Sequence, residues 1–458
     1  MRALLVCLVV LLAGPQALAG ADKIVDPTVD RIAKRYLDTT PIVGFGVTVM
    51  RKGAVIHNAG YGKARLDPVI PADAGTRFDY FSVGKHVTTA LVLRLVERDL
   101  LDLDSPAGKY LPGLDPDYGN ATLRQLLSHT SGMTSPEIDE RDPAAELLVV
   151  PTRESLLDWL AMSERVAPPG ETWLYCSDAF VVAATIAEQL TGASYRELVR
   201  REVAEPLGLG DFGFELTPSA QGYFVEQDTP APIKAVPYEW FSGAGSIRGT
   251  TVDLARWWMA LRSGKVIGEQ SSVAITTPTR LASKGKTAEF GYGLGIRLGS
   301  LAGHRMIGHT GDAAGGTAVL AEYPDDDLLI VVATNTRGKG VPWAIGIQAE
   351  IARTLLGIEI GKPLDQPTPK ALLADAPGFY VSPEGSFCVS ARDDSLFVAY
   401  DDESPVRLLH QGNGVLMPVG HPAAEEYFLG GPGPTPWFAY RYHGFPMDLA
   451  VRTADACP

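Results

Sequence analysis

The chain has 458 residues, 46% of them hydrophobic and 21% charged, so it is long enough to form two domains around a sizeable core. Its formal net charge of −14 argues against a nucleic-acid partner, because proteins that bind nucleic acids usually present a basic surface. The sequence has no long run of like charge and no basic amphipathic helix, so we expect the acidity to favour solubility rather than membrane binding.

Residues 1–19 have the pattern of a secretory signal. Arg2 supplies a minimal positive start, residues 3–13 form a short apolar core, and Ala17-Leu18-Ala19 offers a small-residue cleavage site. The apolar run is too short to span a bilayer. We therefore predict an exported protein, periplasmic or secreted, without stable membrane insertion.

The part of the chain that follows, residues 20–360, shows predicted strands near both of its ends and helices between them. The predicted elements in chain order are a helix at 28–37, strands at 42–50 and 54–59 joined by a hairpin turn, an apolar helix after Ser82, a helical region over 105–210, two strands within 315–335 and a helix at 343–356. Regular strand–helix alternation is absent. We therefore predict an α/β (α+β) sandwich, with an antiparallel sheet flanked by helices and an added all-helical region.

The C-terminal segment has a different pattern. Residues 361–371 are rich in proline and predict a linker. Beyond it, short alternating strands predict a small antiparallel barrel or sandwich over residues 372–458. The expected strands are 387–391, 396–400, 406–410, 415–418, 426–429, 437–442 and 447–451.

The predicted export changes the number of cysteines. Cys7 would leave with the signal, so three cysteines remain, and an odd count in an oxidising compartment leaves at least one thiol free or paired between molecules. Cys388 and Cys457 both lie in the C-terminal segment and could pair, whereas Cys176 is expected to stay unpaired. No Cys-x-x-Cys or His-Glu-x-x-His spacing occurs, so the sequence gives no support for a metal site.

The tetrapeptide Ser82-Val83-Gly84-Lys85 carries the strongest functional signal. A polar, glycine-bearing turn runs into an apolar stretch here, which predicts Ser82 in the first turn of a buried helix and Lys85 one turn later. Residues three apart share a helix face, so the amine can lie beside the hydroxyl. A serine needs a neighbouring base to become a nucleophile, and a lysine with a lowered pKa can be that base. The pattern is typical of serine acyl-transfer enzymes.

Two further motifs follow in the order that such a site needs. Tyr175-Cys176-Ser177 comes after a Pro/Gly turn, and His309-Thr310-Gly311 precedes apolar strands. Each motif is weak alone, and Ser283-x-x-Lys286 repeats the first pattern in a polar stretch with no apolar helix behind it. The signal lies in the joint order and context of the three motifs.

With these motifs, the chain resembles the penicillin-recognising serine hydrolases over about residues 25–358. That group includes class C β-lactamases, D-Ala-D-Ala carboxypeptidases, D-aminopeptidases and β-lactamase-like esterases. The run Leu-Leu-Ser-His-Thr-Ser-Gly within residues 122–132 and the glycine-rich segments 243–246 and 290–295 also resemble the family. The C-terminal strands are similar to the lipocalin-like modules that some members carry.

The resemblance implies a role for each motif residue. Ser82 would be the nucleophile, Lys85 the general base of acylation, and Tyr175 the proton carrier that also activates water for deacylation. The Ser82 backbone N–H, at the start of a helix, is a natural oxyanion donor, and the family pattern gives the second donor to the backbone N–H of Asp312. The substrate-binding and oxyanion set would be Ser177, His309, Thr310, Gly311 and Asp312. No cofactor is needed.

Two motif residues depart from the family's usual pattern. Ser177 stands where asparagine is usual, and a serine has a shorter reach and lacks the paired donor and acceptor of an amide. His309 replaces the lysine of the β-lactamase triplet, and it offers a charge to a substrate carboxylate only when protonated. Both changes favour an enzyme that cleaves a D-amino-acid peptide or a carboxylic ester over an efficient β-lactamase.

Other functions remain open at this point. The chain could be a β-lactamase, or a non-hydrolytic protein that binds penicillin or a wall peptide. A dead hydrolase whose C-terminal module is the functional unit is disfavoured, because Ser82, Lys85 and Tyr175 are all retained. A Ser-His-Asp site built on His129 is disfavoured, because no Gly-x-Ser-x-Gly elbow occurs. The expected partner is a small-molecule or peptide substrate, and the oligomeric state is open.

Overall fold

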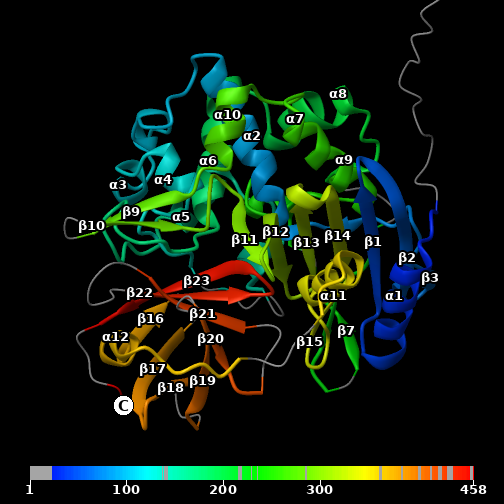
Figure 1. The fold of residues 1–458 in the computed structure, drawn as a ribbon. Helices are drawn as coiled ribbons and strands as arrows, with labels where there is room; N and C mark the ends of the chain where they lie inside the picture. The colour runs from blue at the N-terminus through cyan, green and yellow to red at the C-terminus, as the bar shows by residue number, and fades with distance from the viewer. Residues whose placement is uncertain are drawn as a thin grey trace, which may run out of the picture.

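A computed structural model describes most of the chain after residue 22 (Figure 1). The described residues are 23–136, 138, 143–214, 219–227, 229–234, 236–283, 286–359, 364–382, 385–400, 404–412, 415–420, 425–430, 437–453 and 457. The predicted signal at 1–19 lies outside them, and so do residues 361–363 of the predicted linker.

A seven-stranded antiparallel sheet forms the centre of the first domain. Its strand order is β11-β12-β13-β14-β1-β2-β3, so the N-terminal strands pair with the late ones through β1 and β14. The strands are β1 (Gly44–Arg51), β2 (Ala54–Leu66), β3 (Val69–Pro71), β11 (Arg297–Leu301), β12 (His304–Ala313), β13 (Gly316–Tyr323) and β14 (Leu328–Thr334). The predicted sheet of N- and C-terminal segments is confirmed.

Both faces of this sheet are buried, because alternate residues along each strand face two different hydrophobic cores. Val319 and Ala321 of β13 pack with α1 (Pro27–Thr39) and α11 (Ala344–Leu356) on one face. Ala318 and Leu320 belong to the larger core on the other face, which includes α2 (Lys85–Glu97) and α9 (Thr251–Arg262). Figure 1 shows α11 on one side of the strands and α2 and α9 on the other.

The predicted all-helical region is also present and packs against α2. The remaining helices are α3 (Pro116–Gly119), α4 (Leu123–Leu127), α5 (Arg153–Leu160), α6 (Asp178–Thr191), α7 (Tyr195–Val199), α8 (Glu205–Leu207), α10 (Glu269–Ile275) and α12 (Lys370–Asp375). The described part of the chain also contains three small sheets that the sequence did not predict. One consists of β4 (Phe78–Asp79), β8 (Arg248–Gly249) and β5 (Phe212–Gly213), and a second of β15 (Thr336–Gly338), β6 (Tyr223–Val225) and β7 (Pro230–Pro232). The third pairs β9 (Thr279–Ser283) with β10 (Lys286–Phe290).

The C-terminal strands form a closed antiparallel barrel. They are β16 (Gly378–Ser382), β17 (Gly385–Arg392), β18 (Ser395–Tyr400), β19 (Val406–Gly412), β20 (Val415–Pro418), β21 (Glu425–Gly430), β22 (Trp437–Tyr442) and β23 (Phe445–Arg452). Each strand pairs with the next, and β16 also pairs with β23, which closes the ring. Seven strands match the prediction, and β16 was missed. The domain boundaries at 360 and 372 stay predictions.

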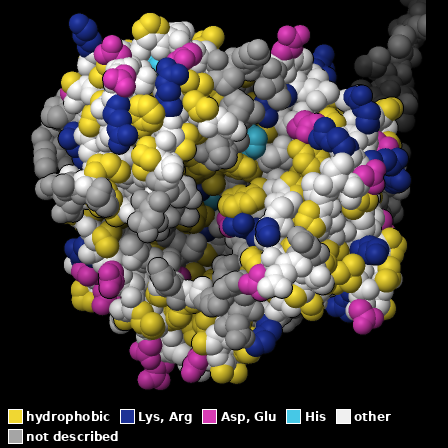
Figure 2. Space-filling model, turned by 90° about the horizontal axis from the view of Figure 1, so that it is seen from below, with side chains coloured by type: hydrophobic (Ala, Val, Ile, Leu, Met, Phe, Trp, Pro, Cys, Tyr) yellow, Lys and Arg dark blue, Asp and Glu magenta, His cyan; other side chains and the backbone are white. Residues whose placement is uncertain are grey.

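The pairing of Cys388 with Cys457, which the sequence left open, is present in the structure. Cys388 of β17 is bonded to Cys457, and Cys176 is a buried free thiol. None of the helices in the described part of the chain combines the length and apolar character that a membrane span requires. On the face seen in Figure 2, the described acidic and basic side chains are scattered among hydrophobic ones rather than gathered by sign.

Candidate active site

Ser82 lies where the helical region meets the sheet. It belongs to a single 3₁₀ turn, η1 (Phe81–Gly84), directly before α2, so it precedes the α-helix rather than opening it as predicted. Phe81 has a φ of 48°, an uncommon value for a bulky residue, and this turns the chain so that Ser82 reaches the edge of β12. Backbone strain of this kind is often found at functional sites.

Lys85 is fully buried and lies beside Ser82. Its Nζ is 2.9 Å from the Ser82 Oγ, and it also donates to the Ala244 carbonyl at 2.8 Å and to the Ser177 Oγ at 3.4 Å. Burial, with a smaller contribution from the nearby Arg297 cation, lowers the pKa of Lys85 to about 7. A lysine with such a pKa is a neutral amine for much of the time near pH 7, so it can accept the serine proton.

Tyr175 and Ser177 come from the segment that leads into α6. The Lys85 Nζ lies 4.9 Å from the centre of the Tyr175 ring, and the Arg297 Cζ lies 5.3 Å from it. The Lys85 amine and the Arg297 guanidinium therefore both lie within cation–π distance of the ring of the predicted proton carrier. The structure thus brings the first two sequence motifs together.

His309 is completely buried and is held in one tautomer. Its Nδ1 donates to the Thr310 carbonyl at 2.5 Å, so its Nε2 accepts a hydrogen bond from the Tyr292 hydroxyl at 2.9 Å. Burial, with Arg297 and Lys85 nearby, holds the pKa of His309 well below its usual value. His309 is therefore neutral at ordinary pH and does not supply the charge that a lysine would at this place.

Arg297, which the sequence analysis missed, is the cation next to this motif. It begins β11, is only 4% exposed, and lies 5.8 Å from the centres of the Trp173 and Tyr292 rings. Its Nη1 donates to the Pro446 and Met447 carbonyls, and its Nε has no hydrogen-bond partner. Among the residues whose burial is described, Lys85 and Arg297 are the only buried lysine and arginine. The one signal for Arg297 in the sequence is a charged residue within the apolar run Leu294 to Leu298.

The edge of β12 passes directly beside Ser82. β11 pairs with β12 only as far as Gly308, so residues 309–313 have β13 as their one strand partner. A methyl group added to Gly311 would lie 2.8 Å from the Ser82 backbone nitrogen, so the strand approaches as closely as a backbone can. The side chain of Asp312 points to Arg337, which it meets at 3.1 Å. This ion pair partly offsets the negative charge that would oppose an oxyanion at the Asp312 backbone.

His129 has the structural place that the sequence predicted. It is fully buried among Trp173, Tyr175, Phe180 and Tyr292, and its Nδ1 accepts a hydrogen bond from the Cys176 backbone N–H at 3.1 Å. This bond fixes the segment that carries Tyr175. Burial raises the pKa of the Cys176 thiol to about 11, which makes it a poor nucleophile.

Taken together, the described residues place every predicted catalytic side chain at one junction. Ser82, Lys85 and Ser177 are joined by contacts at Lys85, and Tyr175, His309 and Arg297 surround them. The roles of these residues stay predictions. In the described residues, no group of three or more His, Cys, Asp or Glu could hold a metal ion.

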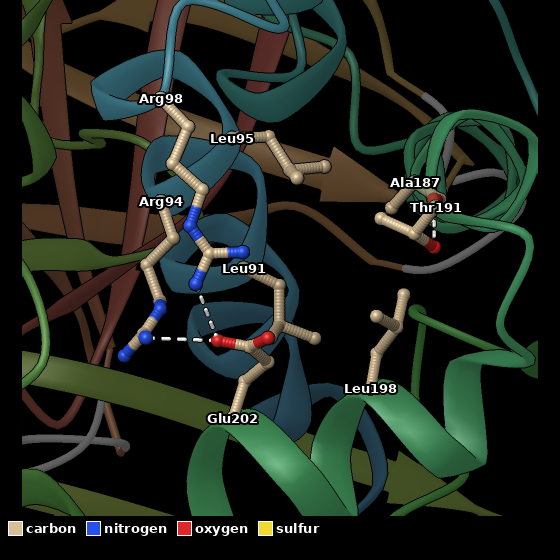
Figure 3. Close-up of a pocket in the computed structure, with 8 residues that line it drawn as sticks. All are labelled: Leu91, Arg94, Leu95, Arg98, Ala187, Thr191, Leu198 and Glu202. Atoms are coloured by element: carbon tan, nitrogen blue, oxygen red, sulfur yellow. Dashed lines mark hydrogen bonds and ion pairs between the residues drawn. The ribbon is translucent and has the colours of Figure 1, made fainter.

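A separate depression lies farther along α2 (Figure 3). It is lined by Leu91, Arg94, Leu95, Arg98, Ala187, Thr191, Leu198 and Glu202. The Glu202 carboxylate contacts both Arg94 at 2.8 Å and Arg98 at 2.7 Å, and Figure 3 shows the three side chains turned toward one another. Each of these three charged side chains thus already has an ionic partner within the depression.

A central antiparallel sheet, helices on both of its faces and a buried Ser-x-x-Lys pair at its edge define a class of serine acyl-transfer proteins. The family model "Beta-lactamase" matches residues 29–352, which is well over half of the chain. The protein therefore belongs to the β-lactamase family of penicillin-recognising serine hydrolases.

Individual relatives are distant. The chain is 24% identical over 303 residues to penicillin-binding protein 4* of Bacillus subtilis, and the match covers 62% of this chain and 66% of that protein. The octameric penicillin-binding protein homologue of Pyrococcus abyssi has the same fold, with a TM-score of 0.63 and 19% identity over 92% of this chain and 99% of that one. The D-amino acid amidase of Ochrobactrum anthropi SV3 gives a TM-score of 0.62 and 19% identity over 73% of this chain and 99% of that one.

Proposed function

We propose that the protein is an exported serine hydrolase that forms an acyl-enzyme on Ser82 with a D-amino-acid peptide or a carboxylic ester. The observation that carries this proposal is the 2.9 Å contact between Ser82 Oγ and the buried Lys85 Nζ. Export rests on the predicted signal at residues 1–19.

The first half-reaction uses Lys85 as the base. Neutral Lys85 takes the Ser82 proton while the hydroxyl oxygen attacks the substrate carbonyl, and the tetrahedral oxyanion accepts hydrogen bonds from the backbone N–H groups of Ser82 and Asp312. Tyr175, with its phenol near Lys85 and Arg297, delivers a proton to the leaving group. The C–O or C–N bond to that group then breaks, and the acyl group stays on Ser82.

The second half-reaction returns the serine. Tyr175 takes a proton from a water molecule as the water attacks the acyl carbonyl, and Lys85 passes a proton back to the Ser82 oxygen as the acid leaves. The segment of β12 around Gly311 would lie along the substrate backbone, because it brings an unpaired strand edge to the serine without an intervening side chain.

Arg297 supports a substrate that carries a carboxylate. Its guanidinium is buried, its Nε is unpartnered, and its partners are main-chain carbonyls rather than an acidic side chain. A permanent cation of this kind suits the carboxylate end of a peptide leaving group. The D-amino acid amidase with a similar fold also acts, by its name, on D-amino-acid compounds. Ser177, with its short reach, is compatible with an ester as well.

Intact-protein mass spectrometry tests the proposal. The protein is incubated in turn with a penicillin, a D-Ala-D-Ala peptide and a short-chain activated ester, as wild type, as Ser82→Ala and as Ser283→Ala. An adduct or turnover that disappears in Ser82→Ala and persists in Ser283→Ala supports the acyl-enzyme, and the donor with the fastest turnover identifies the substrate class. Absence of adduct and turnover with all three donors would contradict the hydrolase and favour a binding protein.

A further inference from the structure

The barrel does not stand apart from the hydrolase domain, because its last hairpin enters that domain's core. Phe445, at the start of β23, is completely buried and belongs to the core that α1 and α11 share with the sheet. Ala439 and Leu449 pack with Trp173 and Tyr292, in the aromatic cluster that borders Tyr175. Figure 1 shows β23 beside β11.

Backbone contacts fix the position of this hairpin along β11. The Ser300 N–H donates to the Gly444 carbonyl at 3.2 Å. A methyl group added to Gly299 would lie 2.1 Å from the Gly444 oxygen, and one added to Gly444 would lie 2.3 Å from the Ser300 oxygen. The two chains are thus in direct backbone contact, and either glycine could carry a side chain only if the hairpin moved.

The same hairpin holds Arg297. Both carbonyls that accept from its Nη1, those of Pro446 and Met447, come from β23. The Met447 Sδ also lies 4.0 Å from the Oγ1 of Thr310, the central residue of the third motif. Apolar packing would be enough to dock a barrel, yet this contact places two main-chain carbonyls on a buried arginine that faces the Tyr175 ring.

We propose that the β22–β23 hairpin is part of the active site, where the Pro446 and Met447 carbonyls position the Arg297 guanidinium and the Met447 thioether limits the space beside Thr310. The barrel is then a positioning element for the site cation rather than an appended binding module. The kinetic part of this inference rests on the proposed hydrolase function.

Gly444→Ala tests the positioning in the full-length protein, and Gly420→Ala is its control. Both glycines have positive φ values, 89° and 93°, so both substitutions strain the backbone, but nothing lies within 4 Å of a Cβ at Gly420. Only the first variant should push the hairpin from β11. We expect the KM of a D-Ala-D-Ala peptide to rise about 10-fold in Gly444→Ala, while kcat/KM for a neutral activated ester changes less than about 2-fold.

A second measurement needs no substrate: NMR records how fast the Arg297 Nε–H proton exchanges with water. The Nε–H signal is assigned by its loss in Arg297→Lys. We expect slow exchange in the wild type and in Gly420→Ala, and faster exchange in Gly444→Ala. Equal exchange rates in the two glycine variants would overturn the proposal. An equal loss of kcat/KM with the peptide and with the ester in Gly444→Ala would also overturn it. If no donor reacts with the wild type, the hydrolase function fails while the exchange rates still decide the positioning.

Met447→Ala provides a second test if Gly444→Ala does not fold. Removing the thioether should open the space beside Thr310, so peptides with a larger C-terminal side chain should gain several-fold relative to D-Ala-D-Ala. An unchanged preference would show that Met447 does not limit the site.

Discussion

Two regions of the molecule each bring one buried basic side chain to the same site, and the two side chains suit different tasks. Lys85 stands at the start of α2 in the helical region, where burial lowers its pKa to about 7, so its proton can move during a reaction. Arg297 begins β11 at the sheet edge, where barrel carbonyls accept from it, and a guanidinium keeps its charge at any working pH.

The difference shows how one site can combine proton transfer with a permanent charge. A lysine shifts its pKa readily when buried, whereas an arginine does not, so only the Lys85 side can hold the base. His309 is neutral, so it adds no second titrating charge beside Arg297 on the substrate side of the site. Substitution of Lys85 should therefore mainly lower the rate of proton transfer, whereas substitution of Arg297 should mainly weaken substrate binding.

The largest effect is expected from Lys85→Met, which removes the base. We expect kcat to fall by about 10³-fold, since general base catalysis contributes 10²- to 10⁴-fold. In the wild type, the acylation rate should rise with pH through about 7, because only neutral Lys85 accepts the serine proton. Rapid-mixing kinetics with an activated ester measure both effects, with the exposed Lys109→Met as the control. An acylation rate that is independent of pH between 5.5 and 8.5 would contradict the role of Lys85.

The same substitution should stabilise the fold. The pKa of Lys85 is lower in the folded protein than the value of about 10.4 in an unfolded chain, so the unfolded state binds the extra proton between about pH 7 and 10. The destabilisation from Lys85 is thus largest below pH 7 and fades as pH rises. Lys85→Met should add on the order of 1–3 kcal/mol at pH 7 and less at pH 9.5. Thermal unfolding at both pH values measures this, and a gain that grows with pH would contradict it.

A smaller loss is expected from Gly311→Ala, at the point where the two regions touch. The added methyl group would lie 2.6 Å from the Tyr80 carbonyl oxygen and 2.8 Å from the Ser82 nitrogen, so β12 or η1 must shift and widen the oxyanion site. Because one oxyanion donor is worth about 10²- to 10³-fold, we expect kcat to fall by about 10²-fold. Steady-state kinetics measure this against Gly210→Ala, where a Cβ meets nothing within 4 Å. Equal kinetics in the two variants would place the oxyanion site elsewhere.

Arg297→Met should reduce binding more than chemistry. A hydrogen bond to a charged group is worth about 1.5–3 kcal/mol, so we expect a 10- to 100-fold higher KM for a substrate with a free carboxylate. A neutral ester should be affected much less. Comparing the two donors in one assay separates the outcomes, and equal losses with both would mean that Arg297 serves the chemistry or the fold instead.

The sequence predicted the helical side of the site much better than the sheet side. Ser82, Lys85 and Tyr175 are close to local signals, because a turn before an apolar helix fixes the first two and a Pro/Gly turn precedes the third. Arg297 was missed because its importance comes from Pro446 and Met447, about 150 residues later, and a sequence pattern does not report such a contact. The neutral state of His309 depends in the same way on burial and on the distant residues Arg297 and Lys85. The barrel strands were predicted from alternation, whereas their docking on β11 depends on glycines that no period reveals.

The smallest effect is expected from Ser177→Asn, which restores the family's usual residue on the helical side. Ser177 Oγ is 3.4 Å from the Lys85 Nζ, a long contact, and an asparagine amide would offer both a donor and an acceptor farther into the site. We expect kcat/KM for a D-Ala-D-Ala peptide to rise about 3-fold relative to a neutral ester, since one added hydrogen bond is worth about 0.5–1.5 kcal/mol. The measurement is the ratio of kcat/KM for the peptide to kcat/KM for the ester on one preparation. Ser177→Ala is the control for loss of the hydroxyl. A ratio that falls in Ser177→Asn would indicate that the smaller serine makes room for the substrate, and that the helical side as well as the sheet side sets the specificity.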